Sequence, residues 1–295
     1  MRIKSFIFDK HRVGYLFVLP SFFVLFCFVI IPLMAAFFSG FFSFTIMLDK
    51  FDFVGFKNFE AVLNDWRFWN SMKNTLYFTV VVVPLQTVFS LFIATAISKV
   101  NRINVLFRTI FFLPVVCSMT IIAMSIAMMF NYNFGIIPAA FRNMGLPVID
   151  LFKSTRWAMP MVMLISIYKN FGFNMIIFVA ALHSVPYTLY EAADIDGANA
   201  SKKFFNITLP AIAPTVTFTL MTSTISSFQV FDQVYVTTRG GPLYSTETVV
   251  QLIYERAFKT NEMSFANANA VLLFIIIFIA TLTVQRARKN AEIQF

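Results

Sequence analysis

The sequence predicts an all-α membrane protein with six transmembrane helices. Hydrophobic residues make up 59% of the 295 residues and charged residues only 13%, against about 25% charged in an ordinary soluble domain. The apolar residues gather in six long stretches that carry no charge or one charge, and a helix needs about 20 such residues to cross a membrane. These stretches are continuous rather than alternating, which favours helices over a β-barrel. This composition argues against a soluble globular protein and excludes a disordered chain.

Each stretch defines one expected span. The first span is longer than the apolar core of a signal peptide, which is about 7–15 residues, so we expect a retained helix. We expect residues 1–295 to form a single transmembrane domain. The spans should lie near 14–38, 74–98, 107–130, 157–182, 207–232 and 264–285.

Lys and Arg set the expected orientation. With the N-terminus inside, 12 basic residues fall in about 58 residues of inside segments and 10 fall in about 83 residues of outside segments. This density difference predicts that both termini lie on the inner side. It also accounts for the net charge of +9 without a nucleic-acid partner.

Sequence motifs for catalysis are missing. The chain contains no GxxxxGK[ST] phosphate loop, no HExxH or GxSxG motif, and no Cys/His cluster with metal-ligand spacing. We therefore expect no catalytic residue, no metal site and no cofactor in this chain. A proton-coupled carrier would place carboxylates in the middle of the membrane, and the expected spans show none there.

The longest inside loop, 184–210, carries the clearest motif. Glu191-Ala192-Ala193 favours a helix, Gly197 permits a turn with positive φ, and Ala198 begins a second short helix. Pro210 stands near the start of the fifth span, where a missing N–H does little harm. The loop is predicted to be a helix, a glycine turn and a helix, joined directly to two spans.

This loop resembles the EAA loop of binding-protein-dependent ABC importer permeases. The matching positions are Glu191, Ala192, Ala193, Gly197, Ile207, Leu209 and Pro210. The form Asp196-Gly197-Ala198 resembles the carbohydrate-uptake class, and residues 15–20, 107–114 and 239–248 resemble other parts of the maltose-type membrane subunit. The resemblance covers nearly the whole chain and implies the type I ABC importer permease fold.

The resemblance implies a function and a set of partners. The chain would be half of the pathway of an ATP-driven importer for a sugar or oligosaccharide, in a bacterial-type cytoplasmic membrane and in contact with lipid. Its partners would be a second, non-identical permease, two ATPase subunits that bind ATP and Mg, and an extracytoplasmic solute-binding protein. A permease of the same family for glycerol phosphate or a polyamine, an ion-coupled carrier, and a membrane enzyme remain as alternatives.

Two surface sites follow from the same resemblance. The coupling loop would dock on the ATPase, and the outer loop with the turn sequence Arg239-Gly240-Gly241-Pro242 would receive the binding protein, unless that loop is only a tight external turn. The expected ATPase-coupling residues are Glu191, Ala192, Ala193, Asp196, Gly197, Ala198, Leu209 and Pro210, and the expected docking residues are Gly240, Gly241 and Pro242.

Polar side chains at helical spacing mark a candidate substrate path in three spans. Such residues either line a cavity for sugar hydroxyls or hold neighbouring helices together. The candidates are Gln86 in the second span, Ser166, Lys169, Asn170, Phe173 and Asn174 in the fourth, and Ser223 and Ser227 in the fifth. Those of the fourth and fifth spans also fall, counted from the EAA motif, where the maltose-type subunit contributes to its sugar site.

Lys169 is the one basic residue well inside an expected span. It either snorkels toward the inner surface as a structural residue or meets an anionic group of the solute. No acid of the expected spans lies at its level, since Asp232 is placed nearer the outer end.

Overall fold

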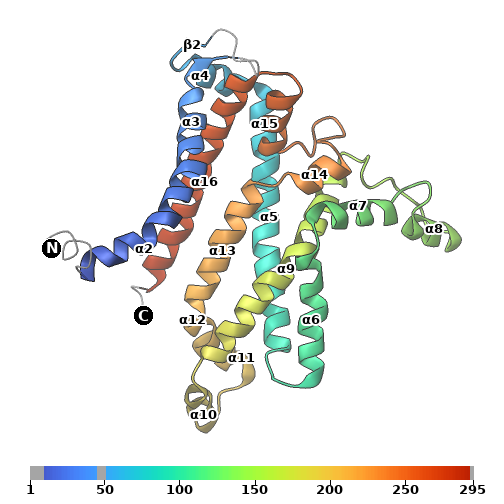
Figure 1. Ribbon diagram of the computed structural model, residues 1–295. Helices are drawn as coiled ribbons and strands as arrows, with labels where there is room; N and C mark the ends of the chain where they lie inside the picture. The colour runs from blue at the N-terminus through green and yellow to red at the C-terminus, as the bar shows by residue number, and fades with distance from the viewer. Residues whose placement is uncertain (1–9, 45–50, 293–295) are drawn as a thin grey trace. The chain divides into compact units, whose positions relative to one another are not determined.

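The computed structural model describes residues 10–44 and 51–292 and divides them between two compact units (Figure 1). The first unit combines Met1–Asp65 with Ile253–Leu272, and the second combines Trp66–Leu252 with Leu273–Phe295. Three basic residues that enter the orientation argument, Arg2, Lys4 and Lys50, lie outside the described residues.

The first unit begins with a long apolar helical segment. It contains α2 (Lys10–Leu25), a π-helical turn η1 (Phe26–Ile30) and α3 (Ile31–Ser39), followed by the two-residue strands β1 (Phe42–Ser43) and β2 (Asp52–Phe53) and by α4 (Lys57–Leu63). None of the residues in the window Phe17–Ser39 is buried within the structure. An apolar helix without a polar face is typical of a segment surrounded by lipid or by another membrane protein.

The end of this helical segment is fixed to the start of α16 (Met263–Glu292). The Asn267 amide donates to the Ser39 hydroxyl at 2.7 Å, and the Ser264 hydroxyl bonds both backbone groups of Phe44. A Cβ on Gly40 would stand 3.6 Å from the Cα of Ala268, so the two backbones approach closely here.

The second unit holds most of the helices. They are α5 (Trp66–Ala96), α6 (Arg102–Val116), α7 (Met119–Met129), α8 (Ile136–Asn143), α9 (Ala158–Ser184), α10 (Tyr187–Ile195), α11 (Ala200–Lys203), the π-helical turn η2 (Phe204–Thr208), α12 (Leu209–Ala211), α13 (Ala213–Phe228) and α14 (Asp232–Thr237). α15 (Val249–Phe258) and α16 each contribute residues to both units.

Helix α9 is the centre of the second unit. It packs against α5, α6, α7, α13 and α14, and its residues Val162, Ile165 and Phe178 are fully buried in three separate apolar clusters. Gly172 makes the contact with α6 possible, because a Cβ there would lie only 2.2 Å from the carbonyl oxygen of Phe111. No other residue type fits at this helix crossing without moving a helix.

The helices long and apolar enough to span a membrane agree in number with the expected spans, with two differences in shape. Four are continuous: Phe17–Ser39, Trp66–Ala96, Ala158–Ser184 and Met263–Arg286. Two are bent pairs, Arg102–Val116 with Met119–Met129 and Ala200–Ala211 with Ala213–Thr237, and counting each pair as one span gives six in the described part of the chain.

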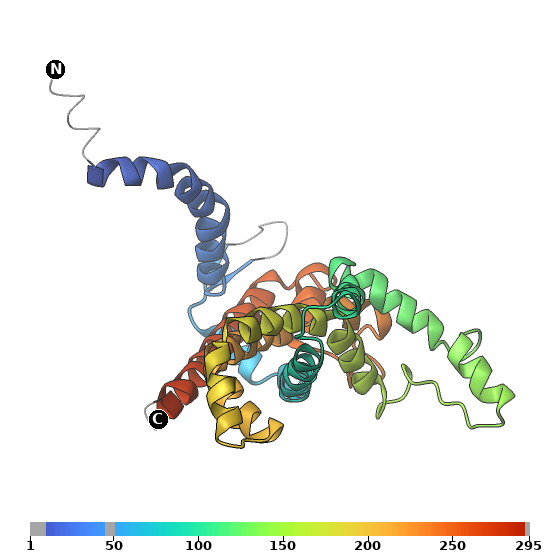
Figure 2. The same cartoon turned by 90° about the horizontal axis from the view of Figure 1, so that it is seen from below.

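The third expected span, 107–130, is therefore not one straight helix. The chain breaks at Cys117 and Ser118, which are extended, and α7 runs at 98° to α6. Pro114 has already removed one helical hydrogen bond just before this break. Figure 2 shows α7 and α8, in green, leading away from the end of α6. Hydropathy carries no sign of this bend because both halves are apolar.

The fifth expected span, 207–232, also differs. It starts in the π-helical turn η2, bends by 68° near Ile212 and ends at Phe228. Asp232 then begins the separate helix α14.

Candidate functional site

A cavity of about 500 Å³ lies within the second unit. Its walls come from α5, α9 and α13, from the junction of α6 with α7, and from the segment that leads into α14. The lining residues are Gln86, Val115, Met119, Ser166, Lys169, Asn170, Phe173, Asn174, Thr222, Ser223, Ser226, Ser227, Gln229, Val230, Phe231, Asp232 and Gln233.

All eight side chains expected along the substrate path line this one cavity. The helical spacing placed them on common faces, and the structure brings the three faces together. Their role in binding stays a prediction. Sequence reasoning missed the residues at and after the turn that follows α13, notably Gln229 and Gln233, since a short gap between helices carries no periodic pattern.

Hydrogen bonds hold the polar walls in place. The Asn174 amide donates to the Ser223 hydroxyl at 3.1 Å, which links α9 to α13. The Ser90 hydroxyl contacts the carbonyl of Phe171 at 2.9 Å and so links α5 to α9. Asn174 is 2% exposed and Gln86 5% exposed. Polar groups this deep are positioned before any solute arrives.

Two residues of opposite charge line the cavity. Asp232 lines the same cavity as Lys169, so an acid does share the space with this cation. Within residues 10–44 and 51–292 neither side chain forms an ion pair. The cavity therefore offers a solute both a cationic donor and an anionic acceptor.

The coupling loop has the predicted local structure. Helix α10 ends at Ile195, Gly197 has φ +69°, and Asn199 caps α11 by accepting from the backbone N–H of Lys202. The N–H of Ala198 donates to the carbonyl of Ala193, and that of Gly197 to the carbonyl of Asp194. This pair of bonds is a Schellman motif, in which Gly197 occupies the position that needs a positive φ.

The loop exposes a mixed surface. Glu191, Ala192, Asp196, Gly197 and Pro210 are exposed, while Ala193, Ala198 and Leu209 are half-buried. Ile195, which the motif does not single out, is 88% exposed. A small exposed alanine beside exposed carboxylates and one large apolar side chain suits docking into a groove of another protein.

The outer loop with Gly240, Gly241 and Pro242 is held rigidly. The Thr246 hydroxyl donates to the Gly241 carbonyl at 2.7 Å and lies 2.7 Å from the Thr238 hydroxyl, from which it accepts. Gly240 has φ +84° and is buried, whereas Gly241 and Pro242 are half-buried. Leu243 in this loop is 88% exposed, so a docking partner would meet Leu243 before the predicted glycines.

A buried ion pair anchors this loop to the start of α5. The Arg67 guanidinium holds the Glu247 carboxylate through two donors, with an Nη2–Oε1 distance of 2.5 Å and an Nε–Oε2 distance of 2.9 Å. Glu247 is 1% exposed. The Asn74 amide adds bonds to the carbonyls of Tyr244 and Glu247 at 2.8 and 3.0 Å.

A metal site is not visible in the described part of the chain. Across residues 10–44 and 51–292, no three His, Cys, Asp or Glu side chains come together as a metal ion would require.

Comparison with known proteins agrees with this arrangement. The family model described as "Binding-protein-dependent transport system inner membrane component" matches residues 86–289. The sn-glycerol-3-phosphate transport system permease protein UgpA of Agrobacterium fabrum is 31% identical, with 95% of each chain covered. The lactose transport system permease protein LacF of Rhizobium radiobacter is 32% identical, covering 92% of this chain and 91% of the relative.

A solved structure has the same fold. A chain of a bacterial alginate ABC transporter, in complex with an alginate pentasaccharide-bound periplasmic protein, superposes with a TM-score of 0.84 at 21% identity, covering 99% of this chain and 98% of that chain. The fold is thus that of a type I ABC importer permease, a non-catalytic membrane subunit. Together with the family match over more than half of the sequence, this shows that the chain belongs to the inner membrane components of binding-protein-dependent ABC transport systems.

Proposed function

We propose that this chain forms half of the translocation pathway of a saccharide importer and that the 500 Å³ cavity binds the solute. The observation that carries the proposal is the lining itself. Amides, hydroxyls and the ring of Phe173 converge from three spans on one cavity. A saccharide needs many hydrogen-bond partners of both kinds and an apolar ring face, and this lining supplies them.

The charges of the cavity favour an uncharged saccharide. Lys169 and Asp232 bring opposite charges to the same space, so an anionic solute attracted by one is repelled by the other. A sugar hydroxyl can accept from the ammonium group and donate to the carboxylate, and charge-assisted bonds of this kind are stronger than neutral ones. The lactose permease relative supports this choice.

A second candidate is a polyol phosphate. The glycerol-phosphate permease relative supports it, and Lys169 is the cavity residue that would meet the phosphate. In this case Asp232 would have to turn away from the solute.

The partners follow from the family and are part of the proposal. A second, non-identical permease completes the pathway, an extracytoplasmic binding protein delivers the solute to the outer loops, and two ATPase subunits with bound ATP and Mg dock on the coupling loop. The exposed Glu191 would make charge-assisted bonds to the ATPase. ATP binding and hydrolysis would then shift a two-state equilibrium between inward-open and outward-open forms.

Reconstituted uptake tests the proposal. The complete importer is placed in proteoliposomes containing ATP, and uptake of radiolabelled lactose, maltose, arabinobiose and sn-glycerol-3-phosphate is measured with the binding protein outside. We expect vanadate-sensitive uptake of a neutral saccharide that requires the binding protein. Neither flux nor ATPase activity should come from this chain alone, and either activity from the single chain would overturn the proposal.

A substitution in the cavity tests whether the solute binds there. Asn170→Leu should weaken saccharide uptake by about tenfold, the value of one buried hydrogen bond, whereas Thr217→Val should not, because the Thr217 hydroxyl bonds only the Ala213 carbonyl of its own helix. Equal uptake by both variants would place the solute elsewhere.

A further inference from the structure

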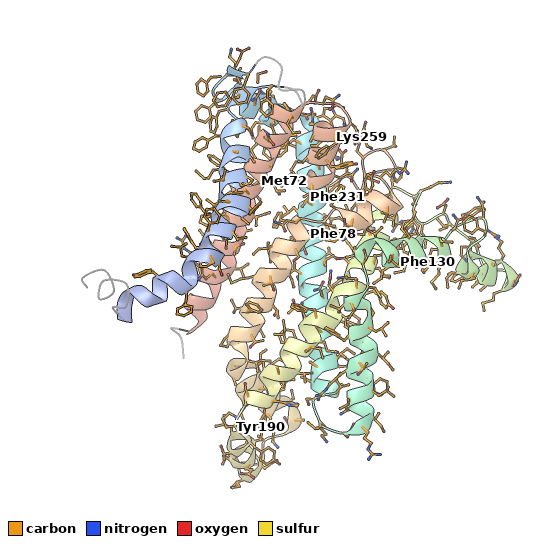
Figure 3. The ribbon with its side chains drawn as sticks, in the orientation of Figure 1. Met72, Phe78, Phe130, Tyr190, Phe231 and Lys259 are labelled. Atoms are coloured by element: carbon orange, nitrogen blue, oxygen red, sulfur yellow. The ribbon has the colours of Figure 1, made fainter. Side chains whose placement is uncertain are left out.

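Two chain segments connect the coupling loop with the cavity. Helix α10 follows α9, which carries Lys169 and Asn174, after the non-helical residues Val185 and Pro186, while η2 leads through α12 into α13, which carries Ser223. Between α10 and η2 the chain passes only through the glycine turn and the four-residue helix α11. Figure 3 shows Tyr190 at the end of the second unit that carries this loop, away from Phe231 of the cavity.

One side-chain hydrogen bond bypasses that turn. The hydroxyls of Tyr190 on α10 and Thr208 at the end of η2 lie 2.8 Å apart. Thr208 is 6% exposed, and its hydroxyl also donates to the Lys203 carbonyl at 3.4 Å, which leaves Tyr190 as the donor of the shorter bond. An ion pair between Asp194 and Lys203 spans the same turn, but it ends on α11 rather than on η2, and the Asp194 side chain is 63% exposed, so water weakens it.

The Tyr190–Thr208 hydrogen bond joins α10 to an irregular stretch of helix. Thr208 closes the π-helical turn, and the 68° bend near Ile212 follows within one turn. π-helical turns are frequently functional. Motion of α10 could also reach η2 through the backbone of the turn at Gly197. This turn is exposed, its glycine has φ +69°, and a Cβ there would meet no atom within 4 Å. We therefore expect the turn to deform instead of transmitting the motion.

A second crosslink joins the same two segments at the cavity. The Asn174 amide donates to the Ser223 hydroxyl at 3.1 Å. The segments are therefore tied at both ends, once beside the solute cavity and once beside the ATPase-docking helix.

We propose that the Tyr190–Thr208 hydrogen bond makes α10 and the start of the fifth span move as one body, and that this bond transmits ATPase motion to α13. Tyr190 and Thr208 are positioning residues, since neither lines the cavity in the described structure. The inference rests on the proposed function, because it requires an ATPase that moves α10.

The test measures coupling in the assembled importer. Tyr190→Phe and Thr208→Val each remove one hydroxyl with almost no change of shape. We expect each to lower the solute transported per ATP hydrolysed by about three- to tenfold, the effect of one hydrogen bond, with normal assembly and unchanged basal ATPase activity. A purely structural role would lower assembly or melting temperature and leave this ratio unchanged.

The double variant makes the test sharper. Because both single variants remove the same bond, the double variant should be no worse than Thr208→Val, which also loses the bond to the Lys203 carbonyl. Thr217→Val is the matched control, a threonine of the same span whose hydroxyl bonds its own helix at 3.0 Å. It should keep the wild-type ratio.

The outcomes separate this inference from the proposed function. Wild-type coupling ratios in both single variants, or additive losses in the double variant, overturn the proposed role of the bond. If the wild-type importer itself shows no ATP-driven uptake, the proposed function fails first, and the coupling role falls with it.

Discussion

Removing Arg67 should release the outer loop, because it leaves the Glu247 carboxylate buried without its cation. Glu247 is 1% exposed, and both of its carboxylate oxygens accept hydrogen bonds from the Arg67 guanidinium. Breaking a buried pair costs about 3–5 kcal/mol. The Arg67 side chain is 17% exposed, so water can reach the site and the lower figure applies. About 3 kcal/mol corresponds to a little over 100-fold in the opening equilibrium of the loop.

The rate of limited trypsin digestion measures the opening of the outer loop. Arg239 is exposed within the loop, and cleavage after it requires a local opening whose population sets the rate. We expect Arg67→Met to speed this cleavage about 100-fold and to lower the stimulation of ATPase activity by the binding protein. Lys73→Met is the control, an exposed lysine on the same helix.

The paired variant can refute the reasoning. Replacing both members, as Arg67→Met with Glu247→Leu, removes the unpaired charge, and such replacements are often close to neutral. Cleavage should then return toward the wild-type rate. If the double variant is as sensitive as Arg67→Met alone, the buried charge is not the cause, and the loop depends on the guanidinium for another reason.

Four further variants, at three positions, test other parts of the structure. Gly172→Ala should destabilise the assembled complex by about 1–3 kcal/mol, seen as a lower melting temperature, because its Cβ meets the Phe111 carbonyl at 2.2 Å; an unchanged melting temperature contradicts the close approach. Gly197→Asn should keep coupled transport, since Asn tolerates positive φ, while Gly197→Pro should uncouple ATP hydrolysis from transport by removing the N–H that bonds the Asp194 carbonyl; coupled transport in the Pro variant, with normal assembly, refutes the role of the turn. Lys169→Gln should lower the affinity for a polyol phosphate by about 10–100-fold and that for a neutral saccharide much less, as measured by competition in uptake assays; equal effects on both solutes make Lys169 a structural residue.

The coupling loop could be predicted in detail because its structure is local. A Schellman motif joins Ala193 to Ala198 within six residues, so the spacing of small residues and glycine already contains the geometry. The same holds for the faces of the cavity. Ser166, Asn170 and Asn174 share one side of α9 because a helix repeats every 3.6 residues, whatever packs against it.

The bends and long-range contacts could not be predicted in this way. Hydropathy measures how apolar a segment is but does not report the angle between consecutive helices. The sequence therefore predicted one span for α6 and α7, although these helices meet at 98°. The sequence placed Asp232 at the end of the fifth expected span. In the structure, the turn after α13 places Asp232 on the lining of the cavity that also contains Lys169.

The sequence alone determined that this chain is a helical membrane protein of six apolar stretches with a coupling loop of the importer family. These features depend on composition and on residues within a few positions of one another. Only the tertiary structure decided which polar faces share a cavity, that Gly172 permits the α6–α9 contact, and that Arg67 pairs with Glu247 across 180 positions. The physical reason is that burial and ion pairing depend on which surfaces meet in space, and a single sequence does not state which segments become neighbours.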